Sequence, residues 1–386
     1  CMPSSPGRSS PAFNPHRRSV LRAVGAMGLS SLALAGCATR SPNRGEGEQT
    51  APGDLSGSQT GQSLSNAAPR RDAPVPALRP GGRVAIVAPA SAADGAAFEA
   101  ADWLQTRGFE AQIMPAALTR SDAPFEYLAG DDAARLNDLH AAFADPAIGA
   151  VWCLQGGFGS WRIADKLDFG LLRKHPKPFI GYSDITALHL AIQKQAGFVT
   201  FHGPMLAQDL LAGKAEPTAS HVLAMVGGQI GQGAWIDAPP ESNPVVLAPG
   251  VATGRLVGGN LALIAATIGS RHEIATRDAI LFIEDVNEAL PRIDRLLSQL
   301  RAAGKFDRIK GVLVGNFTRL GLPGGDAAGQ FQLFPLLQEQ FQARGIPVLA
   351  AWPSGHGDPN LTLPLGALVT LDTQRRGLRL EQPVAV

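Results

Sequence analysis

The 386-residue chain has few cysteines, few tyrosines and little charge. It holds 3 cysteines and 2 tyrosines, and charged residues make up 17% of it, with a formal net charge of +1 at pH 7. Three cysteines do not form a disulfide framework, and this charge balance gives no electrostatic footprint for nucleic acid. No CxxC or HExxH spacing supports a zinc site. The sequence therefore predicts no metal, no cofactor and no nucleic-acid partner.

A long hydrophobic run is also missing near the N-terminus, where the apolar stretch from Ala23 to Gly36 is too short and too rich in Gly and Ala to be a membrane span. It follows Arg17-Arg18, which resembles a twin-arginine export signal. It ends in Leu-Ala-Gly-Cys37, which resembles a bacterial lipobox. We expect residues 1–37 to export the protein to the periplasm and to attach it to a membrane through a lipid on Cys37. An ordinary signal with a chance cysteine is the alternative, and a leader that does not function would leave the protein in the cytoplasm.

Residues 38–78 are rich in Ser, Gly, Gln, Pro and Ala and have almost no large apolar residues. Such a segment cannot bury enough surface to offset its ordering entropy, so we expect a disordered linker. The remaining length predicts about two domains. We place an N-terminal α/β domain at 79–235 and a C-terminal domain at 250–386, with a Gly-, Pro- and Ala-rich connection over about 206–250.

Apolar strands alternate with amphipathic helices in the N-terminal domain. Strands are expected at 82–89, 109–114 and 150–154, and helices at 96–107 and 131–144. This alternation predicts a Rossmann- or flavodoxin-like parallel sheet with ligands at the carboxyl ends of its strands. The C-terminal domain is expected to be a second α/β unit with a mixed sheet.

The most informative stretch is KPFIGYSDITALHL at 177–190, where an apolar strand ends at Gly181 and a helical pattern begins after Ser183. A serine at such a corner is lifted out of the sheet beside free N–H groups, which favour developing negative charge. Ser183 is therefore a candidate nucleophile, although Ile185 stands where a GxSxG elbow has its last glycine. The alternative is that Ser183 merely caps the helix.

A serine nucleophile needs a base, and eight histidines compete for that role. His356 is flanked by two glycines at the end of an apolar strand, in a loop from which an imidazole can project into a cleft. His202 is a minor candidate, and His189 is expected to point along its helix and away from the hydroxyl. Three others are interpreted as solvated surface residues: His140, His175 and His221.

A catalytic histidine also needs an orienting carboxylate. Glu284 ends the apolar strand 279–283, which places its carboxylate at the same kind of sheet edge, half-buried and in need of a partner. Asp285 faces the opposite way if the strand continues. The alternative for Glu284 is a helix-capping role or a salt bridge with Arg292 or Arg295.

The loop Gly156-Gly157-Phe158-Gly159 follows a strand and can present consecutive N–H groups to an anion. It lacks the GxGxxG and GxxxxGK[ST] patterns, so nucleotide binding has little support. A tight turn is the alternative. The remaining cysteine outside the leader, Cys153, is interpreted as a small buried hydrophobic residue.

Seven blocks from about residue 156 onward resemble the serine LD-carboxypeptidase family, the muramoyltetrapeptide carboxypeptidases, in order and spacing. They are GGFGSWRI at 156–163, FIGYSDITAL at 179–188, FHGPML at 201–206, GRLVGGNLALI at 254–264, ILFIEDVNE at 280–288, RIDRLLSQL at 292–300 and GHG at 355–357.

The resemblance implies that Ser183 is the nucleophile, His356 the general base and Glu284 its orienting carboxylate. It implies an oxyanion hole formed by the backbone N–H groups of Gly157 and Asp184. It also implies a metal-independent, commonly dimeric enzyme with its site between two domains, which releases terminal D-Ala from murein tetrapeptides by cleaving an L,D bond.

Three further residues, Gly156, Phe158 and Arg162, are expected to bind the substrate, and Arg162 is a candidate for holding its terminal carboxylate. Three other functions are open. Microcin C immunity proteins share this fold and triad but cleave a cytoplasmic aminoacyl-adenylate analogue, which the leader argues against. A non-catalytic wall-binding lipoprotein would keep the fold without the chemistry. A nucleotide-dependent enzyme would need the phosphate-loop lysine that the chain lacks.

Overall fold

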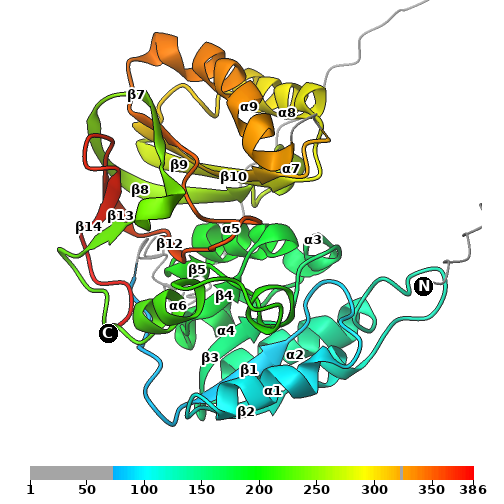
Figure 1. Ribbon diagram of the computed structural model, residues 1–386. Helices are drawn as coiled ribbons and strands as arrows, with labels where there is room; N and C mark the ends of the chain where they lie inside the picture. The colour runs from blue at the N-terminus through cyan, green and yellow to red at the C-terminus, as the bar shows by residue number, and fades with distance from the viewer. Residues whose placement is uncertain (1–72, 322–324) are drawn as a thin grey trace, which may run out of the picture. The chain divides into compact units, whose positions relative to one another are not determined.

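The computed structural model describes residues 73–321 and 325–386, which form two β-sheets with helices around them (Figure 1). The predicted leader, Cys37 and residues 38–72 of the predicted linker lie outside these residues. The prediction of disorder is wrong for residues 73–78, because Val75 and Leu78 are buried and their N–H groups donate to the carbonyls of Val384 and Val226. Among the described residues, none of the helices combines the length and the hydrophobicity that crossing a membrane requires.

The first sheet has five parallel strands and one antiparallel edge strand. In spatial order the strands are β12 (Leu363–Leu365), β5 (Thr200–His202), β4 (Phe179–Gly181), β3 (Ile148–Cys153), β1 (Arg83–Val87) and β2 (Glu110–Ile113). The parallel strands follow the 2-1-3-4-5 order of flavodoxin-like sheets. The predicted parallel sheet is therefore confirmed.

Helices and short helical turns connect these strands. They are α1 (Ala96–Gln105), η1 (Pro115–Leu118), α2 (Asp132–Ala144), α3 (Ser160–Ala164), α4 (Phe169–Lys174), η2 (Ser183–Ile185), α5 (Thr186–Gln195), the π-helix η3 (Leu206–Leu211) and α6 (Thr218–Val226). The carboxylate of Asp131 accepts the N–H of Ala134 at 2.7 Å and so caps α2, and Asp168 caps α4 in the same way. The predicted helices α1 and α2 are confirmed, with ends displaced by one or two residues.

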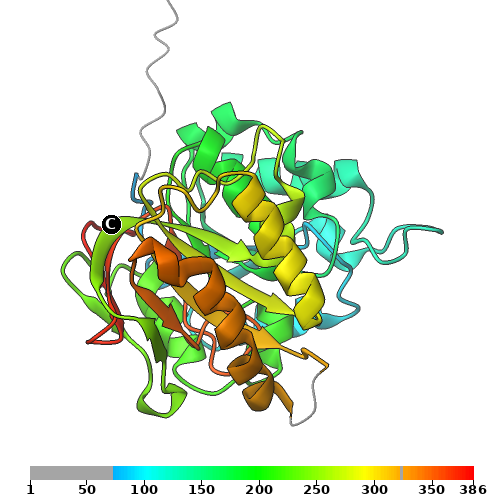
Figure 2. The same cartoon turned by 90° about the horizontal axis from the view of Figure 1, so that it is seen from above.

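The second sheet has eight strands and is mixed. In spatial order they are β6 (Trp235–Asp237), β14 (Gly377–Leu380), β13 (Leu368–Asp372), β8 (Val251–Asn260), β9 (Ala279–Val286), β10 (Gly311–Thr318), β11 (Val348–Ala350) and β7 (Val245–Ala248). Strands β8 to β11 are parallel, and the others pair antiparallel. Three helices cover one face, α7 (Leu261–Ala266), α8 (Leu290–Ala302) and α9 (Gly325–Phe341), as Figure 2 shows from above. The short turns η4 (Pro240–Ser242) and η5 (Gln342–Arg344) complete the elements.

The segment 206–250, predicted to be an irregular connection, contains η3, α6, η4 and two strands. The strands are β6 and β7, which form the two edges of the second sheet by pairing with β14 and β11. Each has only three or four residues, so its own sequence carries almost no periodicity, and the partner strand decides its structure. In the same way β12, from near the C-terminus, joins the first sheet by pairing with β5.

Alternate residues of β9 pack into two different cores. Ile280 and Phe282 belong to the larger core, which includes the first sheet, whereas Leu281 and Ile283 pack under the helices of the second sheet. Successive side chains of a strand point to opposite faces. Glu284 therefore faces the first sheet, and Asp285 faces the helices that cover the second sheet. This alternation brings Glu284 toward the carboxyl end of β4.

Candidate active site

Ser183 lies at the corner between β4 and η2, with a backbone φ of +62°. A non-glycine residue in this left-handed region is strained and persists only where its surroundings hold it. Gly181 allows the corner to close, because a Cβ there would lie 3.1 Å from side-chain atoms of both Cys153 and Ile185. Neither η2 nor α5 has a side-chain cap, so the capping alternative for Ser183 is wrong.

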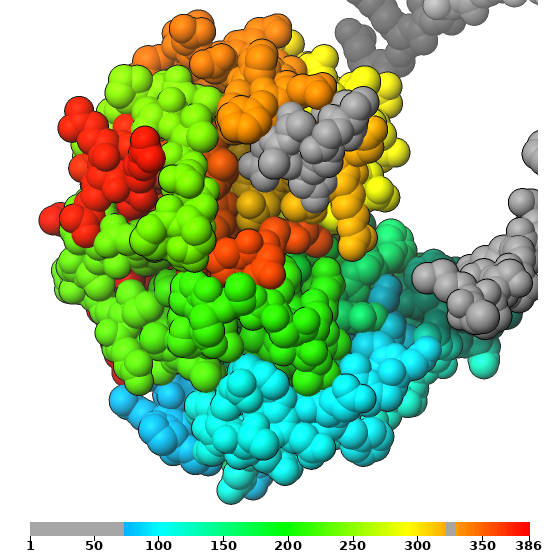
Figure 3. Space-filling view, in the orientation of Figure 1, coloured from blue at the N-terminus to red at the C-terminus, as the bar shows by residue number. Residues whose placement is uncertain are grey.

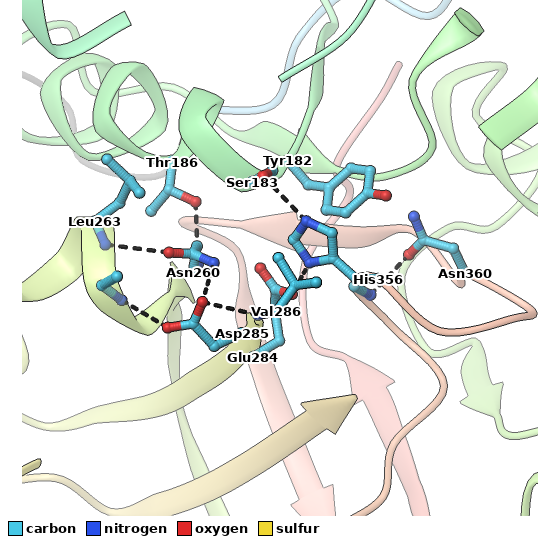
Figure 4. A network of polar contacts seen from close by, with 12 residues as sticks. Tyr182, Ser183, Thr186, Asn260, Leu263, Glu284, Asp285, Val286, His356 and Asn360 are labelled. Atoms are coloured by element: carbon cyan, nitrogen blue, oxygen red, sulfur yellow. Dashed lines mark hydrogen bonds and ion pairs between the residues drawn. The ribbon is translucent and has the colours of Figure 1, made fainter. Parts of the chain in front are cut away.

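The structure brings Ser183, His356 and Glu284 into one chain of contacts (Figure 4). The Nε2 of His356 lies 3.0 Å from the Oγ of Ser183, and its Nδ1 lies 2.7 Å from Oε2 of Glu284. The three side chains come from positions separated by 173 residues in one pair and 72 in the other. The ring of Tyr182 packs edge-on against the imidazole, with 4.8 Å between centroids. The histidine is therefore held on three sides.

His356 stands on the loop that follows β11, and Figure 3 shows this orange-red segment along the boundary between the two halves of the molecule. The loop approaches Glu284 closely at Gly355, where φ is +108° and a Cβ would lie 2.6 Å from the Oε2 of Glu284. The N–H of Gly355 donates to Oδ1 of Asn360 at 2.9 Å. Glycine is thus required before the histidine both for its backbone conformation and for space.

Glu284 is fully buried, and His356 is the partner of its Oε2. Its other carboxylate oxygen has no hydrogen-bond partner among the described residues. A buried carboxylate is costly unless it is paired, so the imidazole is the group that offsets this cost. The alternative salt bridge with Arg292 is wrong, because Arg292 pairs with Glu288 at 2.5 Å.

Asp285 lies in a separate polar network on the helix side of β9 (Figure 4). It accepts the side-chain N–H of Asn260 at 2.8 Å and the backbone N–H groups of Ala262 at 3.0 Å and Val286 at 2.8 Å. The backbone N–H of Asn260 in turn donates to Oγ1 of Thr186, on the helix that follows Ser183. Burial, together with the neighbouring Glu284, raises the pKa of Asp285 to about 7. This network links β8 and β9 of the second sheet to the start of α5, beside Ser183.

The glycine-rich loop lies against the serine hydroxyl. A Cβ on Gly156 would stand 3.2 Å from the Oγ of Ser183. Gly157 has a φ of +100° and is packed against Ser91. Asp184 is the second residue of η2, where a backbone N–H has no partner within the helix. The two N–H groups expected to form an oxyanion hole therefore belong to segments that border Ser183.

The side chain of Asp184 is buried and turned toward α3, where Oδ2 accepts the N–H of Ser160 at 2.8 Å. Arg162, on the same helix, donates from Nε to Oδ1 of Asp132 at 2.8 Å and lies over the ring of Phe125. The guanidinium is thus engaged by a carboxylate of the protein itself. The ring of Phe158 is half-exposed next to the glycine-rich loop.

Three other histidines are held by contacts away from the serine hydroxyl. His189 contacts the carbonyl of Gly181 through Nε2 at 2.8 Å, and burial lowers its pKa to about 4. His202 is fully buried between the rings of Tyr182 and Phe282, and burial holds its pKa well below its usual value. The prediction that His221 is solvated is wrong. Its Nδ1 accepts the N–H of Thr362 at 3.1 Å and burial lowers its pKa to about 4, because α6 is packed against the segment before β12.

Sequence reasoning missed a buried polar cluster behind the histidine. The hydroxyl of Tyr182 donates to Oδ1 of Asp209 at 2.9 Å, and Lys214 pairs with the same oxygen at 2.5 Å. Lys214 also donates to the carbonyl of Gly355 at 3.4 Å. Tyr182 is adjacent to the candidate nucleophile and could have been noticed, but nothing in the local sequence marks Asp209 or Lys214.

Two family models match the chain and together cover both sheets. The LD-carboxypeptidase N-terminal domain matches residues 84–203, and the LD-carboxypeptidase C-terminal domain matches residues 253–371. The chain belongs to the LD-carboxypeptidase family. The family resemblance stated from the sequence is confirmed, as is the predicted combination of a parallel sheet with a mixed sheet.

Individual relatives of this chain agree with the family models. The probable murein peptide carboxypeptidase of Bacillus subtilis (strain 168) is 38% identical over 311 residues, which are 80% of this chain and 94% of the relative. The murein tetrapeptide carboxypeptidase of Pseudomonas aeruginosa is 35% identical over 306 residues, 76% of this chain and 94% of the relative. Among solved structures, the microcin C7 self immunity protein MccF superposes with a TM-score of 0.71 at 25% identity, covering 81% of this chain and all of that one.

Proposed function

We propose that this LD-carboxypeptidase is a serine peptidase in which Ser183, His356 and Glu284 form the catalytic triad. The observation that carries the proposal is the unbroken contact chain of 3.0 Å and 2.7 Å through the imidazole. Glu284 accepts a hydrogen bond from the Nδ1–H of His356, which leaves the lone pair of Nε2 directed at the Ser183 hydroxyl. The strained backbone of Ser183 supports the same role, because strain at a corner of this kind is typical of functional residues.

The triad acts as base and then as acid. His356 takes the Ser183 proton as the alkoxide attacks the carbonyl that precedes the terminal residue. The N–H groups of Gly157 and Asp184 hold the oxyanion, and each such donor lowers the barrier by about 3 kcal/mol. His356 then gives its proton to the departing amine. Water, activated by the same imidazole, then hydrolyses the acyl-enzyme ester, which releases the shortened peptide and restores the Ser183 hydroxyl.

We propose murein tetrapeptides as the substrate, with terminal D-Ala as the leaving group and the L-centre of meso-diaminopimelate as the acyl side. The names of the Bacillus and Pseudomonas relatives, a murein peptide and a murein tetrapeptide carboxypeptidase, support this choice. The test is mass spectrometry of purified muropeptides after incubation with the full chain. Loss of one alanine from tetrapeptides, absent with Ser183→Ala, is the expected result. No change with the unaltered protein would contradict the proposal.

A second candidate is a microcin C-type immunity peptidase acting on an aminoacyl-adenylate analogue. The likeness to MccF over its whole length favours it. Assaying a murein tetrapeptide and a peptidyl-adenylate analogue side by side separates the two, and we expect turnover of the tetrapeptide alone.

We also propose that the protein is exported, attached to a membrane through Cys37, and a homodimer. Fractionation of cells carrying the natural chain or Cys37→Ala tests the anchor: the natural chain should sediment with membranes and the variant should not. Recovery of the natural chain from the cytoplasm would contradict export. Light scattering of the purified protein tests the dimer.

A further inference from the structure

Three half-exposed aromatic rings form a continuous surface beside the glycine-rich loop. They belong to Phe125, Tyr127 and Phe158, and their side chains are 42%, 42% and 50% exposed. The rings of Tyr127 and Phe158 meet edge to face at 5.6 Å between centroids, and those of Tyr127 and Phe125 at 6.3 Å. We name these three residues the aromatic ledge. The first two rings stand on the segment between η1 and α2, which projects from the rest of this half in Figure 2.

The ledge begins at the candidate active site. Phe158 is two residues from Gly156, a separation of at most about 7 Å along the chain, and Gly156 borders the Ser183 hydroxyl. The N–H of Phe158 donates to Oγ of Ser91 at 3.1 Å, which fixes the loop beneath its ring. From Phe158 the ledge continues through Tyr127 to Phe125.

The extent of the ledge indicates which end of a substrate it would contact. Terminal D-Ala is a single residue and cannot reach across two successive ring-to-ring steps of 5.6 Å and 6.3 Å. On the acyl side of a murein tetrapeptide, three residues separate the scissile carbonyl from the lactyl group of the sugar, an extended reach of about 11 Å. The two ring-to-ring steps together are about as long as this reach, so the ledge matches the acyl side of the substrate in length.

The chemistry of the ledge fits the sugar better than the peptide. The stem peptide carries carboxylates and only small apolar groups, which gain little from an aromatic surface. A hexosamine ring has an apolar face of C–H groups that packs on the negative face of an aromatic ring, and polar edges that the Tyr127 hydroxyl can bind. The guanidinium that lies over Phe125, that of Arg162, is held by Asp132, and Arg120, which donates to the carbonyl of Glu126, is held by Asp94.

We propose that the aromatic ledge is a subsite for the amino-sugar end of muropeptides, so that the enzyme prefers peptides still attached to their glycan. The proposal rests on the proposed function only for the direction in which the stem peptide lies. It predicts that a disaccharide-linked tetrapeptide binds about tenfold more tightly than the free tetrapeptide, since two rings each contribute a modest stacking energy.

Calorimetry with the full-length Ser183→Ala protein tests the subsite without turnover. The two probes are the free tetrapeptide and the same peptide on N-acetylglucosaminyl-N-acetylmuramic acid, with adenosine monophosphate as a third. We expect the tenfold preference for the glycan-linked peptide to shrink to about twofold or less when Phe158→Ala or Tyr127→Ala is added. Phe331→Ala is the matched control, because Phe331 is also exposed but lies on α9, over the second sheet.

Equal affinity for the two murein probes would overturn the subsite, and so would a preference that survives both ledge substitutions. Binding of adenosine monophosphate that is lost with Phe158→Ala, without binding of either murein probe, would overturn it in favour of a nucleobase surface. Turnover by the unaltered protein separates this proposal from the preceding one. Cleavage of both peptides without a difference in affinity refutes the ledge alone, whereas a ledge-dependent difference without cleavage refutes only the proposed function.

Discussion

Glu284 and Asp285 are consecutive residues of β9, yet their carboxylates lie in different regions of the molecule. Glu284 faces the first half, where the His356 imidazole is its hydrogen-bond partner and one of its oxygens has none among the described residues. Asp285 faces the helix layer and accepts three N–H groups. The comparison separates two uses of a buried acid. Glu284 pairs with a histidine and keeps one oxygen without a hydrogen-bond partner among the described residues, whereas both oxygens of Asp285 accept hydrogen bonds.

Removing the hydroxyl of Ser183, the proposed nucleophile, has the largest expected effect. Ser183→Ala should lower kcat roughly 10⁶-fold, because no other hydroxyl replaces the attacking group. The midpoint of thermal unfolding should change little, since alanine accepts the same corner. Steady-state release of D-Ala is the measurement. Ser220→Ala on α6, which removes an exposed hydroxyl bonded to Glu216 at 2.6 Å, should keep full activity. Comparable losses in the two variants would refute a nucleophilic role for Ser183.

Replacing each carboxylate by the corresponding amide compares Glu284 and Asp285 directly. Glu284→Gln should lower kcat roughly 10⁴-fold, because an amide N–H facing Nδ1 selects the wrong imidazole tautomer. Asp285→Asn should leave kcat within about tenfold while it lowers the free energy of unfolding by about 1–3 kcal/mol, since an amide N–H then faces a buried N–H donor. Parallel kinetics and urea unfolding give both quantities. The comparison fails if both substitutions lower kcat equally.

A backbone change on the histidine loop should have an intermediate effect. Gly355→Ala places a methyl group 2.6 Å from Oε2 of Glu284 at a φ of +108°, so the loop must move. A displacement of about 1 Å costs roughly 10²-fold in kcat. Gly345→Ala is the control, because φ there is +64° but nothing lies within 4 Å of the added group. It should cost about 1 kcal/mol of stability and no activity. Full activity in Gly355→Ala would show that the close approach is unimportant.

The last expected effect is on the pH dependence of stability and not on activity. Asp285 has a pKa of about 7 in the folded protein against 3.8 in an unperturbed chain, so the folded state binds the extra proton between these values. The free energy of unfolding should therefore fall as pH rises from about 4 to 7 and level off above that. Urea titrations across this range should show a flatter curve for Asp285→Asn. Glu284→Gln removes a neighbouring negative charge and should shift the window to lower pH. Identical curves for all three proteins would contradict the assignment.

The elbow at Ser183 could be predicted because every contributing signal is local. The apolar run, Gly181 and the helical spacing after Ser183 lie within 14 residues, so strand, corner and helix follow from periodicity and sterics. The position of His356 between two glycines after a strand was likewise visible. The cluster of Tyr182, Asp209 and Lys214 was not, because a buried ion pair depends on which segments pack together.

By itself, the sequence determined the type and approximate bounds of the long elements, the parallel direction of the strands in the first sheet, and the three residue types that a serine hydrolase needs. Only the tertiary structure decided that β6, β7 and β12 complete the sheets, that Tyr182, Asp209 and Lys214 form a buried cluster, and that Arg162 is engaged by Asp132. The physical reason is range. Periodicity acts over a few residues, whereas the edge strands pair with segments a hundred or more residues away. The partners of Arg162 and Glu284 lie 30 and 72 residues away. Packing of distant segments therefore decides what periodicity cannot.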